Sequence, residues 1–162
     1  MAYCLIDTDG VCILDWNVID CSGENETLRV IEELDELEYL KEADVILLEK
    51  QHSFNPKMRN ISTAIYVYFM LRINHEQDRN IKILFYQAKY KLKCCDLKIE
   101  HKSQNKYRQN KNLAIAHTRH LLKSHNNFFE LHKKKDDLAD CFLQGYSYIL
   151  FFTNSYVQKT DE

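Results

Sequence analysis

The sequence predicts an α/β fold in which a mixed β-sheet is flanked by helices. Short runs of β-forming residues, such as residues 2–6 and 45–50, alternate with longer segments that have apolar residues at helical spacing, such as residues 25–39. The 162 residues are 45% hydrophobic and include one Pro and three Gly, so regular elements with short linkers should dominate. We therefore expect a single domain over residues 1–155 and a frayed tail over residues 156–162.

The first two predicted strands form a hairpin. Residues 2–6 (AYCLI) and 11–19 (VCILDWNVI) are rich in β-forming residues, and they flank the sequence Asp-Thr-Asp-Gly at residues 7–10. An Asp-Gly pair between two such runs is a strong hairpin signal. We expect these strands to pair in the antiparallel sense.

A helix and a third strand follow. Residues 25–39 have apolar residues at helical spacing with acids between them, which is typical of an amphipathic helix with a solvated face. Residues 45–50 (VILLEK) form an unbroken apolar run, as in a strand buried on both faces. Glu49 stands at the carboxyl end of this run, where α/β sheets bind ligands. The alternative is a surface glutamate that merely ends the strand.

The middle of the chain mixes apolar and basic segments. Residues 57–74 predict a helix that is apolar around much of its girth, so it is either deeply buried or covers a partner. Residues 81–86 (IKILFY) predict another strand. The basic stretch 87–106 has no sustained periodicity, and we expect a mobile loop whose Lys and Tyr side chains touch phosphates. Residues 108–123 predict a helix, and residues 127–131 a short connector.

The last predicted helix starts at residue 133, ends at about residue 152, and begins with KKKDDLAD. Asp137 and Asp140 are three residues apart, so their carboxylates share one helix face and are close enough to bind one divalent cation. The alternative is that Asp136 and Asp137 only favour the positive helix N-terminus and the lysines are solvated. Asp140 fits that alternative poorly, because the dipole effect fades within the first turn. The apolar face of this helix should pack against a sheet.

Charge is distributed unevenly, although the formal net charge is only −2. Residues 24–44 carry nine acids against two bases, and residues 89–125 carry ten bases against two acids. The basic region is suited to a polyanion such as nucleic acid. No run approaches the ~20 apolar residues of a membrane span and no signal peptide is recognised. We therefore expect a soluble, intracellular protein with no membrane contact.

Three carboxylates suggest a chemistry for this chain. Glu49, Asp137 and Asp140 together would provide hard oxygen ligands, which suit Mg²⁺ or Mn²⁺. Metal ions held in this way can activate a water and stabilise a leaving oxygen during phosphodiester hydrolysis. The sequence thus predicts a metal-dependent nuclease whose basic middle region binds the nucleic acid.

Three segments, VILLEKQ (45–51), YRQNK (107–111) and KKKDDLADCFLQGYSYI (133–149), resemble the Holliday junction resolvases of poxviruses, iridoviruses and related large DNA viruses. That family is RuvC-like and belongs to the RNase H superfamily. The resemblance implies an RNase H-like fold and an endonuclease that resolves four-way DNA junctions with magnesium or manganese. It also implies a homodimer that acts on branched DNA in viral recombination, at sites of viral DNA replication in the infected cell.

The resemblance also assigns roles to residues. It implies that Glu49, Asp137 and Asp140 are the metal-binding catalytic acids and that Lys111 is a basic catalytic residue. The apolar helix at residues 57–74 is where we expect the dimer contact. We expect DNA contacts from Lys50, Gln51, Lys106, Arg108, Lys111 and Lys133.

One departure from the family pattern leaves alternatives open. The family's first strand carries an Asp in a DxGxxN-like motif just before the residues that 2–6 resemble, and this chain begins after it. A second alignment makes residues 1–6 that strand and supplies Asp7 or Asp9 as the acid. If the acid is lost, we expect a catalytically degenerate junction- or DNA-binding protein of the same fold. A third alternative is a helical interaction protein whose acidic segment, residues 24–44, faces a protein partner.

Overall fold

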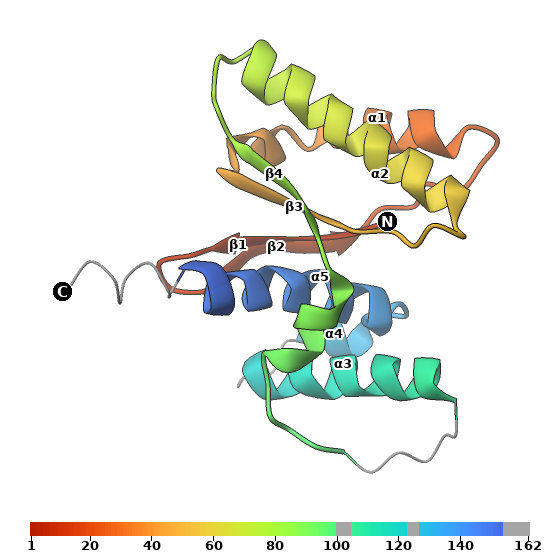
Figure 1. Ribbon diagram of the computed structural model, residues 1–162, viewed down its shortest axis with the longest axis vertical. Helices are drawn as coiled ribbons and strands as arrows, with labels where there is room; N and C mark the ends of the chain where they lie inside the picture. Colours follow the sequence, from red (N-terminus) through yellow and green to blue (C-terminus); the bar gives the residue numbers. More distant parts are fainter. Residues whose placement is uncertain (100–104, 123–126, 154–162) are drawn as a thin grey trace. The chain divides into compact units, whose positions relative to one another are not determined.

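A computed structural model describes residues 1–99, 105–122 and 127–153 (Figure 1). The predicted tail and part of the predicted basic loop lie outside these residues. The chain forms two compact units: unit 1 comprises Met1 and Ile19–Gln87, and unit 2 comprises Ala2–Val18 and Ala88–Glu162. The prediction of a single domain stays a prediction.

Unit 1 is built on a parallel pair of strands that two helices cover (Figure 1). Strands β3 (Val45–Glu49) and β4 (Lys82–Tyr86) pair in parallel over their whole length. Helix α2 (Pro56–Phe69) connects them and packs on β3, and helix α1 (Glu26–Glu36) packs on α2. A helical crossover between parallel strands is the usual βαβ arrangement.

Local sequence explains where these helices begin. The Asn25 side chain accepts a hydrogen bond from the backbone N–H of Leu28 at 3.2 Å, and the Asn55 side chain accepts one from Met58 at the same distance. Such caps satisfy N–H groups that have no partner within the helix. Pro56 follows its cap at the first helical position, where a missing N–H does no harm.

Two short irregular helices extend this unit. A 3₁₀ helix, η1 (Glu38–Glu42), follows α1, and a π-helical turn, η2 (Met70–His75), continues α2. The helix predicted over residues 57–74 is therefore confirmed, but its last turn is wider than an α-helical one.

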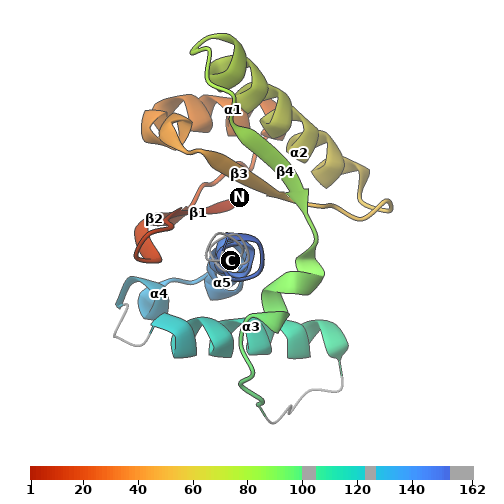
Figure 2. The same cartoon turned by 60° about the vertical axis from the view of Figure 1, so that its left-hand side comes forward.

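Unit 2 is an antiparallel hairpin packed on helices. Strands β1 (Ala2–Asp7) and β2 (Cys12–Val18) pair as the sequence predicts. Helix α5 (Lys135–Tyr148) packs on both strands and on helix α3 (Lys106–Leu122). Figure 2 views α5 nearly along its axis, with the hairpin on one side and α3 on the other. The π-helical turn η4 (Ile149–Thr153) continues α5.

Trp16 lies at the centre of the unit 2 core. Its ring stacks on Phe129 with centroids 5.2 Å apart and an interplanar angle of 9°. Its indole N–H donates to the backbone oxygen of Leu138, in α5, at 3.0 Å. Further along α5, a Cβ on Gly145 would lie 2.7 Å from Cδ1 of Ile6. The glycine thus permits the close approach of helix and strand, and the prediction that this helix packs an apolar face on strands is confirmed.

The described strands form one two-stranded pair in each unit, so the single mixed sheet stays a prediction. Other expectations are wrong. The residues of β3 are half-buried, whereas the sequence predicted a strand buried on both faces. Residues 127–131 form a helix, α4 (Asn127–Leu131), and part of the predicted loop forms a 3₁₀ helix, η3 (Ala88–Lys93). Helices of one or two turns are too short for their apolar period to be recognised in sequence.

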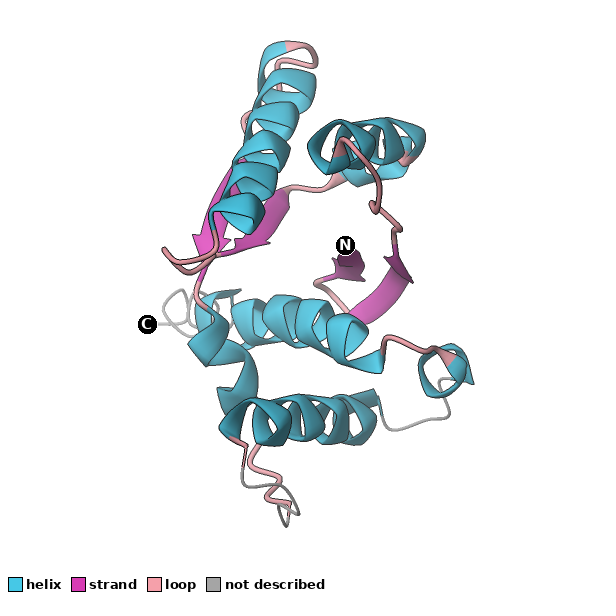
Figure 3. Ribbon diagram, turned by 90° about the vertical axis from the view of Figure 1, so that its right-hand side faces the viewer, coloured by secondary structure: helices cyan, strands magenta, loops and turns pink. Residues whose placement is uncertain are grey.

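The α/β class is confirmed, because the described chain combines helices with both antiparallel and parallel strand pairs (Figure 3). The RNase H-like arrangement stays a prediction. None of the helices in the described ranges is both long enough and apolar enough to cross a membrane.

Candidate active site

The acidic cluster predicted from the sequence lies at the start of α5. Asp136 and Asp137 are in its first turn, and Asp140 is one turn further on. Leu138 and Ala139, between them, are fully buried. This burial fixes the helix against the core and leaves Asp137 exposed, with Asp136 and Asp140 half-buried.

Lys111 approaches this cluster from α3. Its ammonium forms an ion pair with the Asp136 carboxylate, and its Nζ lies 5.0 Å from the centroid of the Tyr107 ring. Burial alone would raise the pKa of Asp136, but the hydrogen bond and the charge of Lys111 lower it below its usual value. Two hydrogen bonds raise the pKa of Lys111: the one to Asp136 has the larger effect and the one to Tyr107 the smaller. The structure therefore favours the charged form of Lys111 beside the acids.

A second lysine, which the sequence analysis did not single out, reaches the cluster from η3. Nζ of Lys91 lies 3.0 Å from Oδ2 of Asp140. The Lys91 side chain is only 10% exposed, and its backbone oxygen accepts a hydrogen bond from the Cys94 thiol at 2.9 Å. Burial raises the pKa of that thiol to about 11. In sequence, Lys91 is one of many lysines in a basic stretch, so nothing there distinguishes it.

The structure brings together only part of the predicted catalytic set. Lys111, Asp137 and Asp140 all belong to unit 2, whereas Glu49 belongs to unit 1. The convergence of Glu49 with the two aspartates therefore stays a prediction. Among residues 1–99, 105–122 and 127–153, no three His, Cys, Asp or Glu side chains form a group that could hold a metal ion. The chemistry of the donors nevertheless suits Mg²⁺ or Mn²⁺, because carboxylate oxygens from Asp137 and Asp140 reach the surface.

The alternative acids, Asp7 and Asp9, lie at the opposite end of α5. The Asp7 carboxylate accepts a hydrogen bond from the backbone N–H of Asp9 at 3.0 Å, and both residues are exposed. The neighbouring Ile6 packs on Gly145, which is roughly 12 Å along the helix from Asp137 at 1.5 Å per residue. This geometry disfavours the second alignment.

The predicted DNA-binding residues are mostly exposed. Lys50 directly follows β3, and its backbone N–H donates to the Tyr86 oxygen at 2.8 Å, which fixes its position at the strand end. Gln51 is half-buried, and its Nε2 donates to the backbone oxygen of Glu49 at 3.3 Å. The remaining exposed cations lie at the start of α3 and just before α5; they are Lys106, Arg108 and Lys133.

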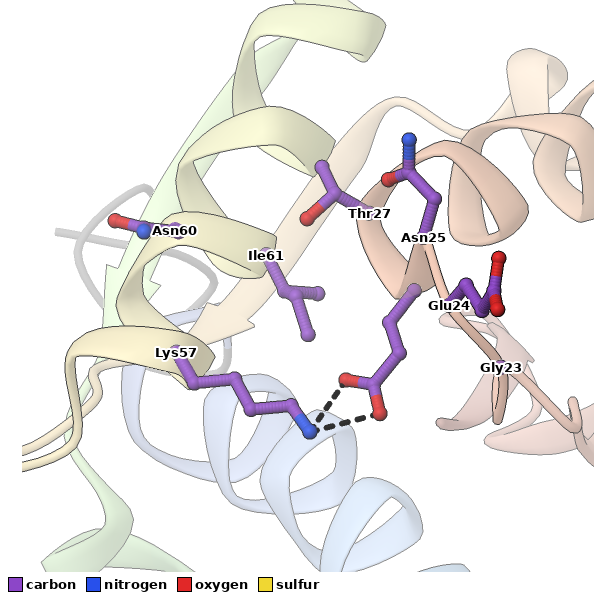
Figure 4. Close-up of a pocket in the computed structure, with 8 residues that line it drawn as sticks. Gly23, Glu24, Asn25, Thr27, Lys57, Asn60 and Ile61 are labelled. Atoms are coloured by element: carbon purple, nitrogen blue, oxygen red, sulfur yellow. Dashed lines mark hydrogen bonds and ion pairs between the residues drawn. The ribbon is translucent and has the colours of Figure 1, made fainter.

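A polar hollow of about 290 Å³ lies where α1 and α2 begin (Figure 4). Across it, Nζ of Lys57 pairs with the Glu26 carboxylate at 2.7 Å. None of the predicted site residues lines this hollow. The ion pair ties the start of α2 to α1, and thereby supports the turn that follows β3.

Comparisons with known proteins show that this chain is similar to viral proteins. A family model described as Poxvirus A22 protein matches residues 1–152. An uncharacterised protein of Acanthamoeba polyphaga mimivirus is 33% identical over 130 residues, which cover 72% of this chain and 30% of that protein. The chain thus spans less than a third of the length of this relative. No solved structure matches the chain.

Proposed function

Because the chain belongs to the poxvirus A22 protein family, the family of Holliday junction resolvases, we propose that it is a metal-dependent, structure-selective endonuclease that resolves four-way DNA junctions by phosphodiester hydrolysis. The observation that carries this proposal is the start of α5, where three carboxylates lie beside two lysines that other elements hold in place. Carboxylates can bind a divalent cation, and fixed ammonium groups can stabilise the charge that develops on a phosphate.

Each of these groups has a role in the proposed reaction. Glu49, Asp137 and Asp140 would hold Mg²⁺ or Mn²⁺, which when bound supplies an activated water and stabilises the leaving oxygen. Lys111 is charged at neutral pH, and its hydrogen bond to Asp136 raises its pKa further. It would stabilise a non-bridging phosphate oxygen.

The DNA would be held by charge along α3. Lys106 and Arg108 are exposed at the start of this helix, five and three residues before Lys111. Cations arranged in this way bind backbone phosphates without reading the base sequence. This fits a nuclease that selects its substrate by DNA structure.

A homodimer is part of the proposal, and α2 offers a surface for it. A hollow of about 720 Å³ lies along α1 and α2 and is lined by apolar side chains that include Val67 and Leu71. These two are 46% and 52% exposed, and Leu28 of α1 is 51% exposed. Apolar patches of this kind mark interaction sites.

In sedimentation experiments we expect a dimer for the wild type and a monomer for Leu71→Glu. A wild type that stays monomeric would contradict this assignment.

A junction cleavage assay tests the proposed activity. The purified protein should cut a synthetic four-way junction with Mg²⁺ or Mn²⁺ and not with EDTA, and it should leave a linear duplex of the same sequence intact. Asp137→Asn should abolish cleavage and retain binding, since it removes a metal ligand and not a phosphate contact. Asp96→Asn, at an exposed acid of the same unit, is the matched control and should cut normally. Cleavage in EDTA, or equal cleavage of the linear duplex, would refute the proposal.

The catalytically degenerate junction-binding protein is the second candidate. The observation in its favour is that, among the residues described, no three potential ligands form a metal-binding group. This candidate predicts tight, salt-sensitive binding of four-way junctions without cleavage in any divalent metal. The same assay therefore separates the two functions.

A further inference from the structure

The ammonium group of Lys111 has two neighbours in unit 2 that restrict its position. The Asp136 carboxylate, in the first turn of α5, forms an ion pair with it. The Tyr107 ring, one turn earlier on α3, has its centroid 5.0 Å from Nζ. Lysine carries its charge at the end of a flexible four-carbon stem. These two contacts therefore determine where the charge of Lys111 stands.

Lys111 differs in solvent access from Lys91, the other lysine that pairs with an acid of α5. The Lys111 side chain is 33% exposed, whereas the Lys91 side chain is 10% exposed. An ammonium group has three N–H donors, so the bond to Asp136 leaves donors for a phosphate oxygen. Of these two lysines, Lys111 is thus the one that a DNA phosphate can reach while the ion pair stays intact.

Helical spacing alone leaves two roles open for Asp136. It stands four residues before Asp140, so the two carboxylates are close enough to share a cation, as those of Asp137 and Asp140 are. The structure distinguishes the adjacent acids. Asp137 is exposed and forms no ion pair within the described part of the chain, whereas a cation on Asp136 would have to compete with Lys111. Asp137 is therefore the better metal ligand, and Asp136 is the acid that holds the lysine.

We propose that Asp136 is a positioning residue of the cleavage reaction and not a metal ligand: together with the Tyr107 ring, it holds the Lys111 ammonium in place for a non-bridging oxygen of the scissile phosphate. The inference rests on the proposed function and adds to it a role for the third acid. A charge stabilises a transition state best when it stands in place before the reaction, because no reorganisation is then needed. Release of Lys111 should therefore slow cleavage more than it weakens DNA binding.

A double-mutant cycle tests this role, with single-turnover rates of junction cleavage measured at saturating protein and Mg²⁺. Lys111→Met should lower the rate by roughly 100- to 1000-fold, the range for loss of one fixed stabilising group. Asp136→Asn, which keeps the side-chain shape, should lower it by roughly 10- to 100-fold through misplacement of the ammonium. In the Lys111→Met background, Asp136→Asn should change the rate by less than about twofold, because no ammonium is left to hold. Junction affinity in EDTA should fall much less than the rate for Asp136→Asn.

Tyr107→Leu tests the second contact independently of α5. The Tyr107 ring is 66% exposed, so its removal should leave the fold intact. This substitution should slow cleavage when Lys111 is present and have no effect in the Lys111→Met background. Asp96→Asn, at an exposed acid of the same unit, is the matched control and should leave the rate unchanged in both backgrounds. Circular dichroism verifies that each variant is folded.

The outcomes separate this inference from the proposed function. A metal ligand, or a residue that only stabilises the fold, is needed whether or not Lys111 is present. If Asp136→Asn slows cleavage by the same factor in both backgrounds, or in neither, the positioning role is overturned and the nuclease is not. An equal effect of Tyr107→Leu in both backgrounds overturns the part of the ring. A wild type that does not cut the junction overturns the proposed function, and the positioning role with it.

Discussion

Nζ of Lys91 lies 3.0 Å from Oδ2 of Asp140, which joins η3 to the acidic start of α5. Because the Lys91 side chain is buried, its ammonium has lost hydration. The Asp140 carboxylate compensates for that loss. Lys111 of α3 forms a comparable ion pair with Asp136. Within unit 2, two of the three acids thus have resident counter-ions, which fixes their positions before any divalent cation binds.

Removal of the Lys91 charge should destabilise the fold. Lys91→Met keeps most of the buried stem but leaves Asp140 without its cation. We expect a loss of about 1–2 kcal/mol in the free energy of unfolding, at the lower end for a broken ion pair because Asp140 is 38% exposed. Urea unfolding measures it, with Lys93→Met at an exposed neighbour as the control. Equal stability of the two variants would show that the pair contributes nothing.

A double-mutant cycle isolates this interaction. Lys91→Met combined with Asp140→Asn should be more stable than the sum of the single losses predicts, because neither charge is then left alone. Additive losses would show that the residues act independently.

The contact between α5 and β1 predicts a conditional effect at Gly145. Alanine should stabilise a helix interior by about 1 kcal/mol relative to glycine, but its Cβ would meet Cδ1 of Ile6. Gly145→Ala alone should therefore change the free energy of unfolding little. In an Ile6→Val background, which lacks Cδ1, the same substitution should be stabilising. Thermal unfolding of the four proteins checks this, and an equal effect of Gly145→Ala in both backgrounds would contradict it.

A pH-dependent contribution is expected from Tyr68 in unit 1. Its hydroxyl donates to Oδ1 of Asp35 at 2.8 Å, and this hydrogen bond, aided by the charges of Arg72 and Lys41, lowers the pKa of Asp35. A lowered pKa means that the stabilisation is present above the unfolded value of about 3.9 and is lost as the pH falls through the folded value. Tyr68→Phe should therefore cost about 1 kcal/mol at pH 7.

Measurement at low pH provides the control for that effect. As the pH falls through the lowered pKa of Asp35, the wild type and Tyr68→Phe should differ progressively less in free energy of unfolding than at pH 7, because Asp35 becomes protonated in the wild type. The same difference at low pH and at pH 7 would show that the hydroxyl does not act through the Asp35 charge.

The features of the fold that depend on a local sequence pattern could be predicted. The Asp-Gly turn at residues 7–10 predicted the β1–β2 hairpin, and the apolar period of α5 predicted the face that meets Ile6. The three aspartates of α5 were found because their spacing is a property of the helix itself. The sequence assigned no metal-binding role to Asp136, and in the structure this residue forms an ion pair with Lys111.

Relationships between distant segments could not be predicted in this way. An apolar run of five residues looks the same whether its strand is half-buried or fully buried, so the half-burial of β3 was not predicted. Lys91 is buried only because η3 packs beside α5, and a lysine in a basic stretch gives no sign of burial. The convergence of Glu49 with Asp137 likewise depends on tertiary structure and not on any local spacing.

Calorimetric titration with Mn²⁺ tests the shared metal site most directly. Wild-type protein, Glu49→Gln, Asp137→Asn and the double variant are compared, since both substitutions keep the side-chain shape and remove a ligand charge. If the two carboxylates bind one cation, each single variant should lose about tenfold or more in affinity, and the double variant should lose less than the two losses combined. Mn²⁺ binding by Glu49→Gln that matches the wild type would contradict the account.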